Sequence, residues 1–461
     1  MSLGSVVTAV VLPIILVLGG GLPAYAAEPL PTTVSLTGSS VYADATSVLQ
    51  IGLTDSTSAP VTGAQVSIER RTGGVWNVIG SVVTDQAGEA RLSSVLSKVA
   101  ADNVFRASYA GDADHLASSS PAVGVALKRR ASVLTLGAPA SVVDERSATL
   151  RIRWATRSGL PVSGAVRVQR RAPGGSWTLA ATLRTGAEGR AQLVITPRVD
   201  TRWRLRAAAL DWVEGAASGV RRIDNLPPNR PVTLPAAAPS PRVQVPAQPR
   251  ATGGGANAQV SRIPDPVWSR MTGVSWHRGC PVGRAGLRYL TINYWDYDGY
   301  RRRGALVANA DAVQQMAGAL SEMYRRGLPL RSLYPVDRFG YSKRLHGGND
   351  YRSMAAGNTS AFNCRSVVNK PGVRSPHSWG RSLDVNTWEN PYRSATGLVP
   401  NSWWQGHSHP RVAWRSRSHP VVEIMAAHDL RWTYGLGDTQ HFDAPAANGR
   451  VLVVPGCEAC D

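Results

Sequence analysis

The sequence predicts a multidomain chain in which two all-β sandwiches precede an α+β domain with a small antiparallel sheet. Three observations lead to this fold class: an internal repeat in the first half, a proline-, alanine- and glycine-rich segment after it, and a last part that holds all four cysteines. A length of 461 residues agrees with about three domains. A hydrophobic content of 43% is enough for ordinary globular cores.

The internal repeat has a period of about 101 residues. The run PVTGAQVSIERR, which begins at Pro60, corresponds to PVSGAVRVQRR, which begins at Pro161, and GGVW at 73–76 corresponds to GGSW at 174–177. Short runs alternate apolar and polar residues between turn residues, as antiparallel strands do. We therefore predict one β-sandwich over residues 30–128 and a second over residues 131–224. Both resemble the immunoglobulin-like domains of bacterial surface proteins, although they lack the inter-sheet cysteine pair of antibody domains.

The composition changes over residues 225–262, which contain LPPNRPVTLPAAAPSPRVQVPAQPRATGGGA and no aromatic residue. Such a segment cannot bury a core of its own. We predict an extended, semi-rigid spacer with a reach on the order of 100 Å. Residues 263–461 then form the last domain, in which apolar residues at helical spacing predict a helix over 308–326.

The N-terminal residues predict export. Residues 6–22 are apolar except for Thr8, and the small residues at 24–27 follow them. This pattern predicts a signal peptide over residues 1–26, cleaved after Ala26. A transmembrane anchor is the alternative, but glycines at 19–21 and Pro23 interrupt the run near 17 residues, whereas a span needs about 20. We expect a secreted, extracellular or cell-wall associated protein with no stable membrane span after cleavage.

The formal net charge is +20, and only four of the 51 basic residues are lysine. An excess of base over acid indicates a polyanionic neighbour, which would be nucleic acid, a membrane surface or an anionic cell wall. Export argues against nucleic acid. The expected partners are therefore the anionic polymers of a cell wall.

The stretch SPHSWGRSLDVN, residues 375–386, places a histidine and an aspartate seven residues apart around a glycine. Residues 381–386 alternate as a strand, with Leu383 and Val385 on one face and Asp384 on the other. His377, in the loop before this strand, can fold over its end toward Asp384. One imidazole and one carboxylate are two of the three protein ligands that a catalytic zinc site typically has.

The segment GDTQHFD, residues 437–443, supplies a third ligand and an acid. His441 precedes the apolar Phe442, as on a buried strand, and Asp438 lies three residues upstream of His441. From there Asp438 can reach a water held at the site. Asp443 is a rival acid, but residues two apart on a strand share a face, so Asp443 would lie beside His441 with less room for the water.

Together the two segments resemble the signature S-x-H-x-x-G-x-(A/S)-x-D followed by (E/D)-x-x-H of zinc D-alanyl-D-alanine carboxypeptidases of the VanY type, in the LAS peptidase group. The similarity covers roughly residues 287–443, and the segments 350–365 and 384–392 look like the actinobacterial branch. It implies a LAS-type α+β zinc peptidase domain over residues 263–461. Two features depart from the family: the acid is Asp438 where many relatives have Glu, and the loop at 432–437 is shorter.

The resemblance also implies roles for individual residues. A zinc ion (Zn2+) would be held by three ligands, namely His377, Asp384 and His441, and Asp438 would be the general base. An arginine upstream of the first ligand commonly binds the substrate in this family, and Arg352 fits that position best. Ser375, which opens the signature, is a second substrate-binding candidate.

The four cysteines fit an oxidising compartment and allow three pairings. We predict that Cys280 pairs with Cys364, because Cys364 follows a loop at 358–363 that must be held near the cleft. We also predict that Cys457 pairs with Cys460 and closes a small terminal loop.

Resemblance and export together imply a secreted zinc metallopeptidase that hydrolyses peptidoglycan stem peptides, with D-alanyl-D-alanine carboxypeptidase as the first expectation. Two alternatives stay open. One is an L-Ala-D-Glu endopeptidase of the same fold, and the other is a non-catalytic wall-binding or adhesin protein with a degenerate peptidase domain. The complete ligand set favours an enzyme.

Overall fold

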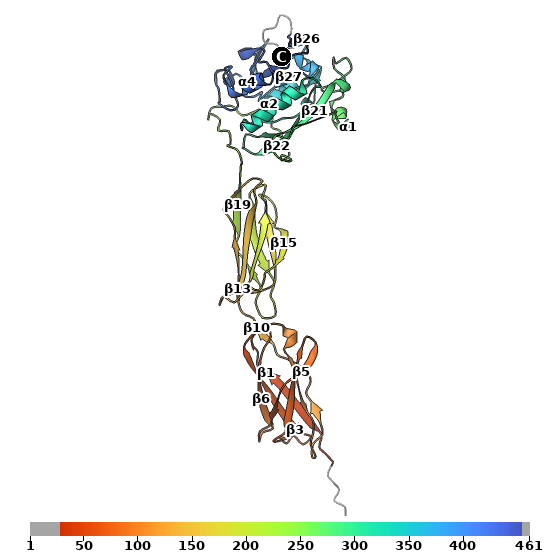
Figure 1. Ribbon diagram of the computed structural model, residues 1–461, viewed down its shortest axis with the longest axis vertical. Coiled ribbons are helices and arrows are strands. Elements are labelled where there is room, and N and C mark those ends of the chain that lie inside the picture. The colour runs from red at the N-terminus through yellow and green to blue at the C-terminus, as the bar shows by residue number, and fades with distance from the viewer. Residues whose placement is uncertain (1–27, 454–461) are drawn as a thin grey trace, which may run out of the picture. The chain divides into compact units, whose positions relative to one another are not determined.

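The computed structural model describes residues 28–453 (Figure 1). The predicted signal peptide and the predicted Cys457–Cys460 bridge lie outside these residues. Between residues 28 and 453, no helix is long and apolar enough to cross a membrane. The described chain divides into two compact units: one contains residues 28–138, 149–194 and 202–221, and the other contains residues 139–148, 195–201 and 222–453.

The first repeat forms two main antiparallel sheets around one core. The first sheet has the order β1-β3-β6, and the second has the order β5-β4-β7-β8 with β9 also paired to β7. Alternate residues of these strands, such as Leu49, Ile68 and Phe105, are fully buried between the sheets. The elements are β1 (Thr32–Gly38), β2 (Val41–Tyr42), β3 (Thr46–Asp55), β4 (Gln65–Thr72), β5 (Val75–Val83), β6 (Glu89–Val95), η1 (Ala100–Asp102), β7 (Val104–Tyr109), β8 (Ser118–Ser119), β9 (Val123–Gly124) and β10 (Leu127–Lys128).

The second repeat builds the same pattern from its own residues. One sheet has the order β11-β13-β16, and the other has the order β12-β19-β17-β14-β15 with β18 on β17. Trp154 on β13 and Leu205 on β17 are fully buried. Both repeats therefore have the two-sheet architecture that their alternation predicts, and the immunoglobulin-like assignment stays a prediction. The elements are β11 (Ser132–Gly137), β12 (Ser141–Val143), β13 (Ala148–Thr156), β14 (Ala165–Arg171), β15 (Thr178–Arg184), β16 (Arg190–Ile195), β17 (Thr201–Ala207), β18 (Ala216–Ala217) and β19 (Arg221–Leu226).

The segment 225–262 is not the free spacer that its composition predicts. Gln248 is buried, its amide donates to the carbonyl of Leu333 (2.7 Å), and its side-chain oxygen accepts from the Tyr294 hydroxyl (2.7 Å). Earlier in the segment, the carbonyl of Pro239 accepts a hydrogen bond from the indole of Trp388 (2.7 Å). Proline removes backbone donors and disfavours regular structure, but its carbonyl still needs a partner. Donors of the C-terminal domain supply such partners, so much of the segment lies against that domain.

The C-terminal domain combines a three-stranded antiparallel sheet, of order β20-β21-β22, with four short helices and four two-stranded pairs. Its elements are β20 (Gln259–Ser261), α1 (Asp265–Met271), η2 (Arg284–Gly286), β21 (Leu287–Trp295), β22 (Arg301–Asn309), α2 (Val313–Arg325), η3 (Val336–Phe339), β23 (Tyr341–Ser342), β24 (Gly347–Gly348), α3 (Asp350–Ala355), β25 (Ser366–Val367), β26 (Lys370–Arg374), η4 (Pro376–Trp379), β27 (Ser382–Asp384), β28 (Tyr392–Ser394), β29 (Gly397–Val399), η5 (Trp403–Gly406), α4 (Pro420–Ala427), η6 (Gly435–Gly437) and β30 (His441–Asp443).

The core of this domain lies where α2 and α4 meet the β21–β22 sheet. Met316 and Leu320 of α2 and Met425 of α4 are buried there, together with Leu383 of β27 and Phe442 of β30. The predicted helix over 308–326 begins later, at Val313, because Ala308 is a buried residue of strand β22, paired with Arg288. An apolar run at 304–308 serves a buried strand as well as a helix, and only the sheet pairing distinguishes the two.

Candidate metal centre

Strands β27 and β30 form an antiparallel pair that brings two of the predicted ligands face to face. The register places Asp384 opposite His441, Leu383 opposite Phe442, and Ser382 opposite Asp443. Leu383 and Phe442 enter the core, so the residues on either side of them point to the opposite face of the pair. The predicted alternation around Asp384 is confirmed, although the strand itself is shorter than predicted.

His377 reaches this face from the 3₁₀ turn η4. Ser375 is the N-cap of that turn, and its hydroxyl accepts from the backbone N–H of His377 (3.3 Å). Gly380 ends the turn with a left-handed φ of 69°. A Cβ at Gly380 would lie 2.8 Å from the backbone nitrogen of Asn309, so both the conformation and the close approach require glycine. This is the reason for the glycine between the histidine and the aspartate.

Each histidine ring is held through its outward nitrogen. Nδ1 of His377 lies 2.6 Å from the carbonyl oxygen of Ala361, and Nε2 of His441 lies 2.8 Å from a carboxylate oxygen of Asp443. A carbonyl and a carboxylate only accept, so these ring nitrogens carry the hydrogens. The lone pairs therefore lie on the inward nitrogens, Nε2 of His377 and Nδ1 of His441.

Asp443 is in turn held by two hydroxyl groups. Its carboxylate accepts from Ser382 (2.7 Å), its cross-strand partner, and from Thr433 (2.6 Å). Burial by itself raises the pKa of the Asp443 carboxyl, but the charge and hydrogen bond of His441 and the two hydroxyl bonds outweigh it and lower the pKa. Asp443 thus acts as the residue that orients His441, and its oxygens are engaged away from the inward nitrogens. From the sequence, we considered Asp443 only as a rival to Asp438 for the role of base.

The two inward nitrogens converge on Asp384. Nε2 of His377 lies 3.2 Å from one oxygen of Asp384, Nδ1 of His441 lies 3.3 Å from the other oxygen, and the two nitrogens are 3.2 Å apart. All three side chains are at most 2% exposed. Three lone-pair donors at these distances, shielded from water, repel one another unless a proton or a metal cation lies between them, and a metal cation can be bound by all three at once.

This donor set fits zinc. Two imidazole nitrogens and one carboxylate oxygen are the ligand types that zinc takes, and three protein ligands leave one position of a tetrahedron open. Ala361 and Asp443 complete the arrangement, because a metal-binding histidine usually donates its other N–H to a carbonyl or carboxylate. The second candidate group among the described residues, His277 with Cys280 and Cys364, has both sulfurs joined in a disulfide and so lacks free thiolates.

Asp438 lies between η6 and β30, on the short loop before His441. Its side chain is fully buried, and its backbone forms an isolated bridge with Tyr392. Tyr434, from the same loop, packs its ring against that of His441 with a centroid distance of 5.3 Å. The shortened loop thus keeps the acid inside the domain, three residues from a ligand. Its role as the base stays a prediction.

The two predicted substrate-binding residues lie in different surroundings. Ser375 is fully buried and caps the turn of His377, which is a positioning role. Arg352 lies on α3 with an exposed side chain, and among the described residues no hydrogen bond or ion pair joins that side chain to the ligands. Their contact with substrate stays a prediction.

Arg365, which the sequence analysis did not single out, is a buried arginine in contact with the ligand turn. Its backbone N–H donates to the hydroxyl of Ser378 (3.2 Å), and its guanidinium forms a buried ion pair with Asp350 (2.9 Å). Its sequence signal was only a charged residue next to a cysteine, which does not distinguish a buried arginine from an exposed one.

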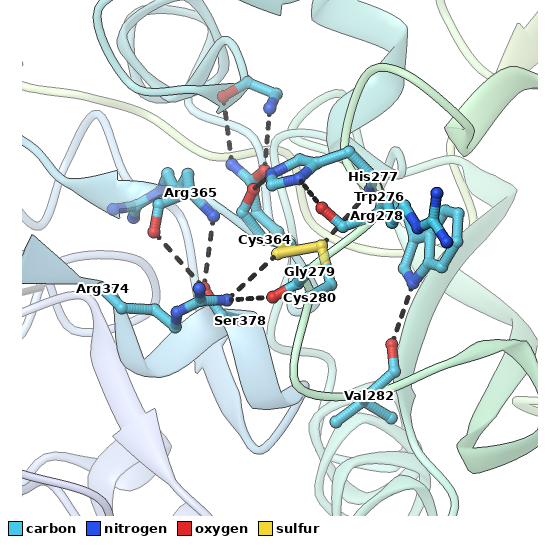
Figure 2. The surroundings of a disulfide bond; sticks show 12 residues. Trp276, His277, Arg278, Gly279, Cys280, Val282, Cys364, Arg365, Arg374 and Ser378 are labelled. Carbon is cyan, nitrogen blue, oxygen red and sulfur yellow. Dashed lines mark hydrogen bonds between the residues drawn. A yellow bond between two sulfur atoms is a disulfide. The ribbon is translucent and has the colours of Figure 1, made fainter. Parts of the chain in front are cut away.

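The predicted disulfide between Cys280 and Cys364 is present. Figure 2 shows it beside Arg365 and Ser378, and Ser378 belongs to the turn η4. The backbone N–H of Cys364 donates to Ser275 (2.9 Å), and that of Asn363 donates to the carbonyl of His377 (3.1 Å). The bridge therefore anchors the segment at 361–365 on which the first ligand rests.

We expect the double substitution Cys280→Ser and Cys364→Ser to lower the free energy of unfolding by about 2–5 kcal/mol, because it releases a long loop in the unfolded chain. Urea unfolding of the zinc-free protein measures this effect without a contribution from metal binding. Peptide mapping of the unreduced parent protein is the companion measurement. A link from Cys364 to Cys457 or Cys460 would show that the pairing is wrong.

In comparison with known protein families, one family model matches part of the chain. A family model described as D-alanyl-D-alanine carboxypeptidase matches residues 368–444, a range that includes His377, Asp384, Asp438 and His441. The match supports a peptidase. No curated protein matches this sequence.

Solved structures also show likeness. The chain is similar to a tetra-tandem repeat in the extending region of a large adhesion protein, with 14% identity, a TM-score of 0.31, and coverage of 61% of this chain and 64% of that chain. It is also similar to E. coli alpha-2-macroglobulin in its native conformation, with 11% identity, a TM-score of 0.21, and coverage of 58% and 18%. The chain spans less than two thirds of the length of each of these proteins.

Proposed function

We propose that this chain is a zinc-dependent peptidase that hydrolyses peptidoglycan stem peptides, acting as a D-alanyl-D-alanine carboxypeptidase. One observation carries the proposal. The inward nitrogens of His377 and His441 converge on Asp384, each ring is fixed from outside, and all of these residues fall within the range that the family model matches. A degenerate domain has no need to keep both the donors and the groups that orient them.

The proposed mechanism divides the work among residues of the chain. Zinc, when bound, supplies an electrophile that polarises a carbonyl and makes water acidic enough to attack near neutral pH. Asp438 accepts a proton from the attacking water and returns it to the leaving amine, as a general base and then a general acid. Ala361 and Asp443 keep the histidine nitrogens aimed inward, so the donors do not reorganise during turnover.

The proposed setting follows from the charge and the N-terminal sequence. A net charge of +20 suits peptidoglycan and anionic cell-wall polymers as partners, and the expected signal peptide places the chain outside the cytoplasm. Nucleic acid is not among the proposed partners. The immunoglobulin-like repeats would then carry the peptidase domain into a wall.

Digestion of purified muropeptides, with mass spectrometry of the products, tests the function. A pentapeptide stem should lose one C-terminal alanine, and the loss should stop when zinc is removed with a chelator and resume when zinc is restored. Cleavage of the stem between L-Ala and D-Glu would instead show that the chain is an endopeptidase and not a carboxypeptidase. Intact stems after incubation with the zinc-loaded chain would contradict the enzyme and favour a wall-binding protein.

A further inference from the structure

The outer face of strands β14 and β17 carries five arginines and no acid. Valines and leucines of these strands point into the core, and the alternate positions face outward. The register sets Arg167 opposite Arg206 and Arg171 opposite Arg202, while Arg204 lies opposite Gln169. We call these five residues the arginine face: Arg167, Arg171, Arg202, Arg204 and Arg206. None of them forms an ion pair with any residue in 28–453, where the ion pairs of the second repeat use other arginines.

This gathering of charge works against the stability of the sheet. Like charges directly opposite each other on neighbouring strands are destabilising. Nor does the next strand, β19, offset them, because Arg222 already binds Asp224 and Asp200. Burial, and then the charges of Arg206 and Arg171, lower the pKa of the Arg204 guanidinium. Such a face is best stabilised by an anion from outside the chain.

The first repeat shows that the fold itself does not need these arginines. At the equivalent register, Ser67 lies opposite Ser108, Arg71 opposite Val104, and Glu69 opposite Arg106. Glu69 and Arg106 form an ion pair at 2.5 Å. Both repeats keep an arginine over a tryptophan, Arg106 over Trp76 (4.5 Å) and Arg204 over Trp177 (4.2 Å). The two faces thus share their architecture and differ in charge.

Composition supports the same contrast. Residues 131–224 contain 15 arginines, no lysine and seven acids, whereas residues 30–128 contain six basic residues and eight acids. A genome-wide preference for arginine over lysine would affect both repeats alike. Of the two repeats, only the second therefore has an excess of positive charge, which points to a role that the first repeat does not share.

We propose that the arginine face binds a linear phosphodiester polymer that carries no bases. Alternate residues of a strand recur every ~6.8 Å, so Arg202, Arg204 and Arg206 form a row that can follow successive phosphates of an extended chain. The guanidinium group matches phosphate with two parallel hydrogen bonds, which lysine cannot do. Arg167 and Arg171 on β14 form a second row beside the first.

The aromatic content of the face argues against nucleic acid as the ligand. Proteins that bind single strands stack bases on exposed aromatic rings. Trp177 is the aromatic residue next to the face, and the guanidinium groups of Arg171 (5.1 Å) and Arg204 (4.2 Å) already lie over its ring. The phosphate backbone is thus the part of a ligand that this face can read. This binding site is independent of the metal centre and of the proposed peptidase activity.

The test replaces three arginines with the residues of the first repeat, in the variant Arg167→Ser, Arg202→Val, Arg206→Ser of the full chain. The probe is a linear glycerol-phosphate polymer, and affinity is measured over a series of salt concentrations. We expect about tenfold or greater weakening and a salt slope that is smaller by about 2, since each lost phosphate contact lowers it by about 0.7. The matched control, Arg146→Ser, Arg157→Ser, Arg190→Ser, removes the same charge from exposed positions off the face and should bind nearly as the parent does.

Three results would overturn the proposal. They are equal weakening by the face variant and the control, unchanged binding by the face variant, and tighter binding of single-stranded DNA of equal charge than of the polymer. If the face variant does not fold, as judged by thermal unfolding, the reciprocal variant decides. Ser67→Arg, Val104→Arg, Ser108→Arg in the first repeat should raise the affinity for the polymer, and no gain would count against the site.

Discussion

Replacement of Asp438 by asparagine is expected to reduce turnover of a stem-peptide substrate by about 10²–10⁴-fold while the bound zinc stays in place. The amide cannot accept a proton from water, so general-base catalysis is lost. The two side chains are almost the same size, and Asp438 is fully buried, so the substitution should leave the surrounding packing intact. Steady-state kinetics together with elemental analysis of the same sample measure both effects.

The matched controls for this substitution are Asp438→Glu and Asp443→Asn. Glutamate keeps the carboxylate, and many members of the family that this chain resembles carry glutamate at this position. Asp438→Glu should therefore retain part of the activity. Normal turnover in Asp438→Asn combined with a loss in Asp443→Asn at full zinc occupancy would assign the base to Asp443. Normal turnover in both Asp438→Asn and Asp443→Asn would show that a different group accepts the proton from the attacking water.

Replacement of His441 by alanine is expected to remove zinc and activity together. The parent chain should hold about one zinc per molecule, and the variant should hold close to none, because two ligands from His377 and Asp384 do not make a tight site. Zinc binding should also raise the unfolding temperature of the parent, since a ligand that binds only the folded state stabilises it. That shift should be absent in His441→Ala.

The variant Asp443→Ala, measured in the same experiment, distinguishes the effect of losing an orienting residue from the effect of losing a ligand. Loss of the carboxylate that holds Nε2 of His441 should weaken zinc affinity by about 10–100-fold, without abolishing binding at high zinc concentration. A competition assay with a zinc chelator of known affinity measures the zinc affinity of the parent chain and of each variant. One zinc per chain in His441→Ala, at parent affinity, would show that the metal is bound elsewhere.

These experiments separate the two proposals. The metal-centre variants change residues of β30 and the loop before it, whereas the polymer-binding variants change β14 and β17 of a different compact unit. Loss of cleavage with intact polymer binding, or the reverse, is therefore a clear result.

Local patterns were sufficient to determine several features from sequence alone. Period-two alternation identified the face of Asp384 and indicated that both repeats consist of strands, because successive side chains of a strand point to opposite faces. The spacing of His377, Gly380 and Asp384 indicated two candidate metal ligands, and the structure shows the short turn that joins them, with Gly380 in the left-handed conformation. The Cys280–Cys364 pair was also correctly predicted.

Only the tertiary structure decided the features that depend on partners far away in the chain. The β27–β30 register sets Asp384 opposite His441 and Ser382 opposite Asp443, whose carboxylate then accepts from the Ser382 hydroxyl. The turn η4 brings His377, which lies 64 residues before His441, to the same face. The proline-rich segment showed no partner in sequence, yet Gln248 is buried through hydrogen bonds to Leu333 and Tyr294. Composition reports what a segment can bury by itself, whereas hydrogen bonds to distant donors form only once the rest of the chain has folded.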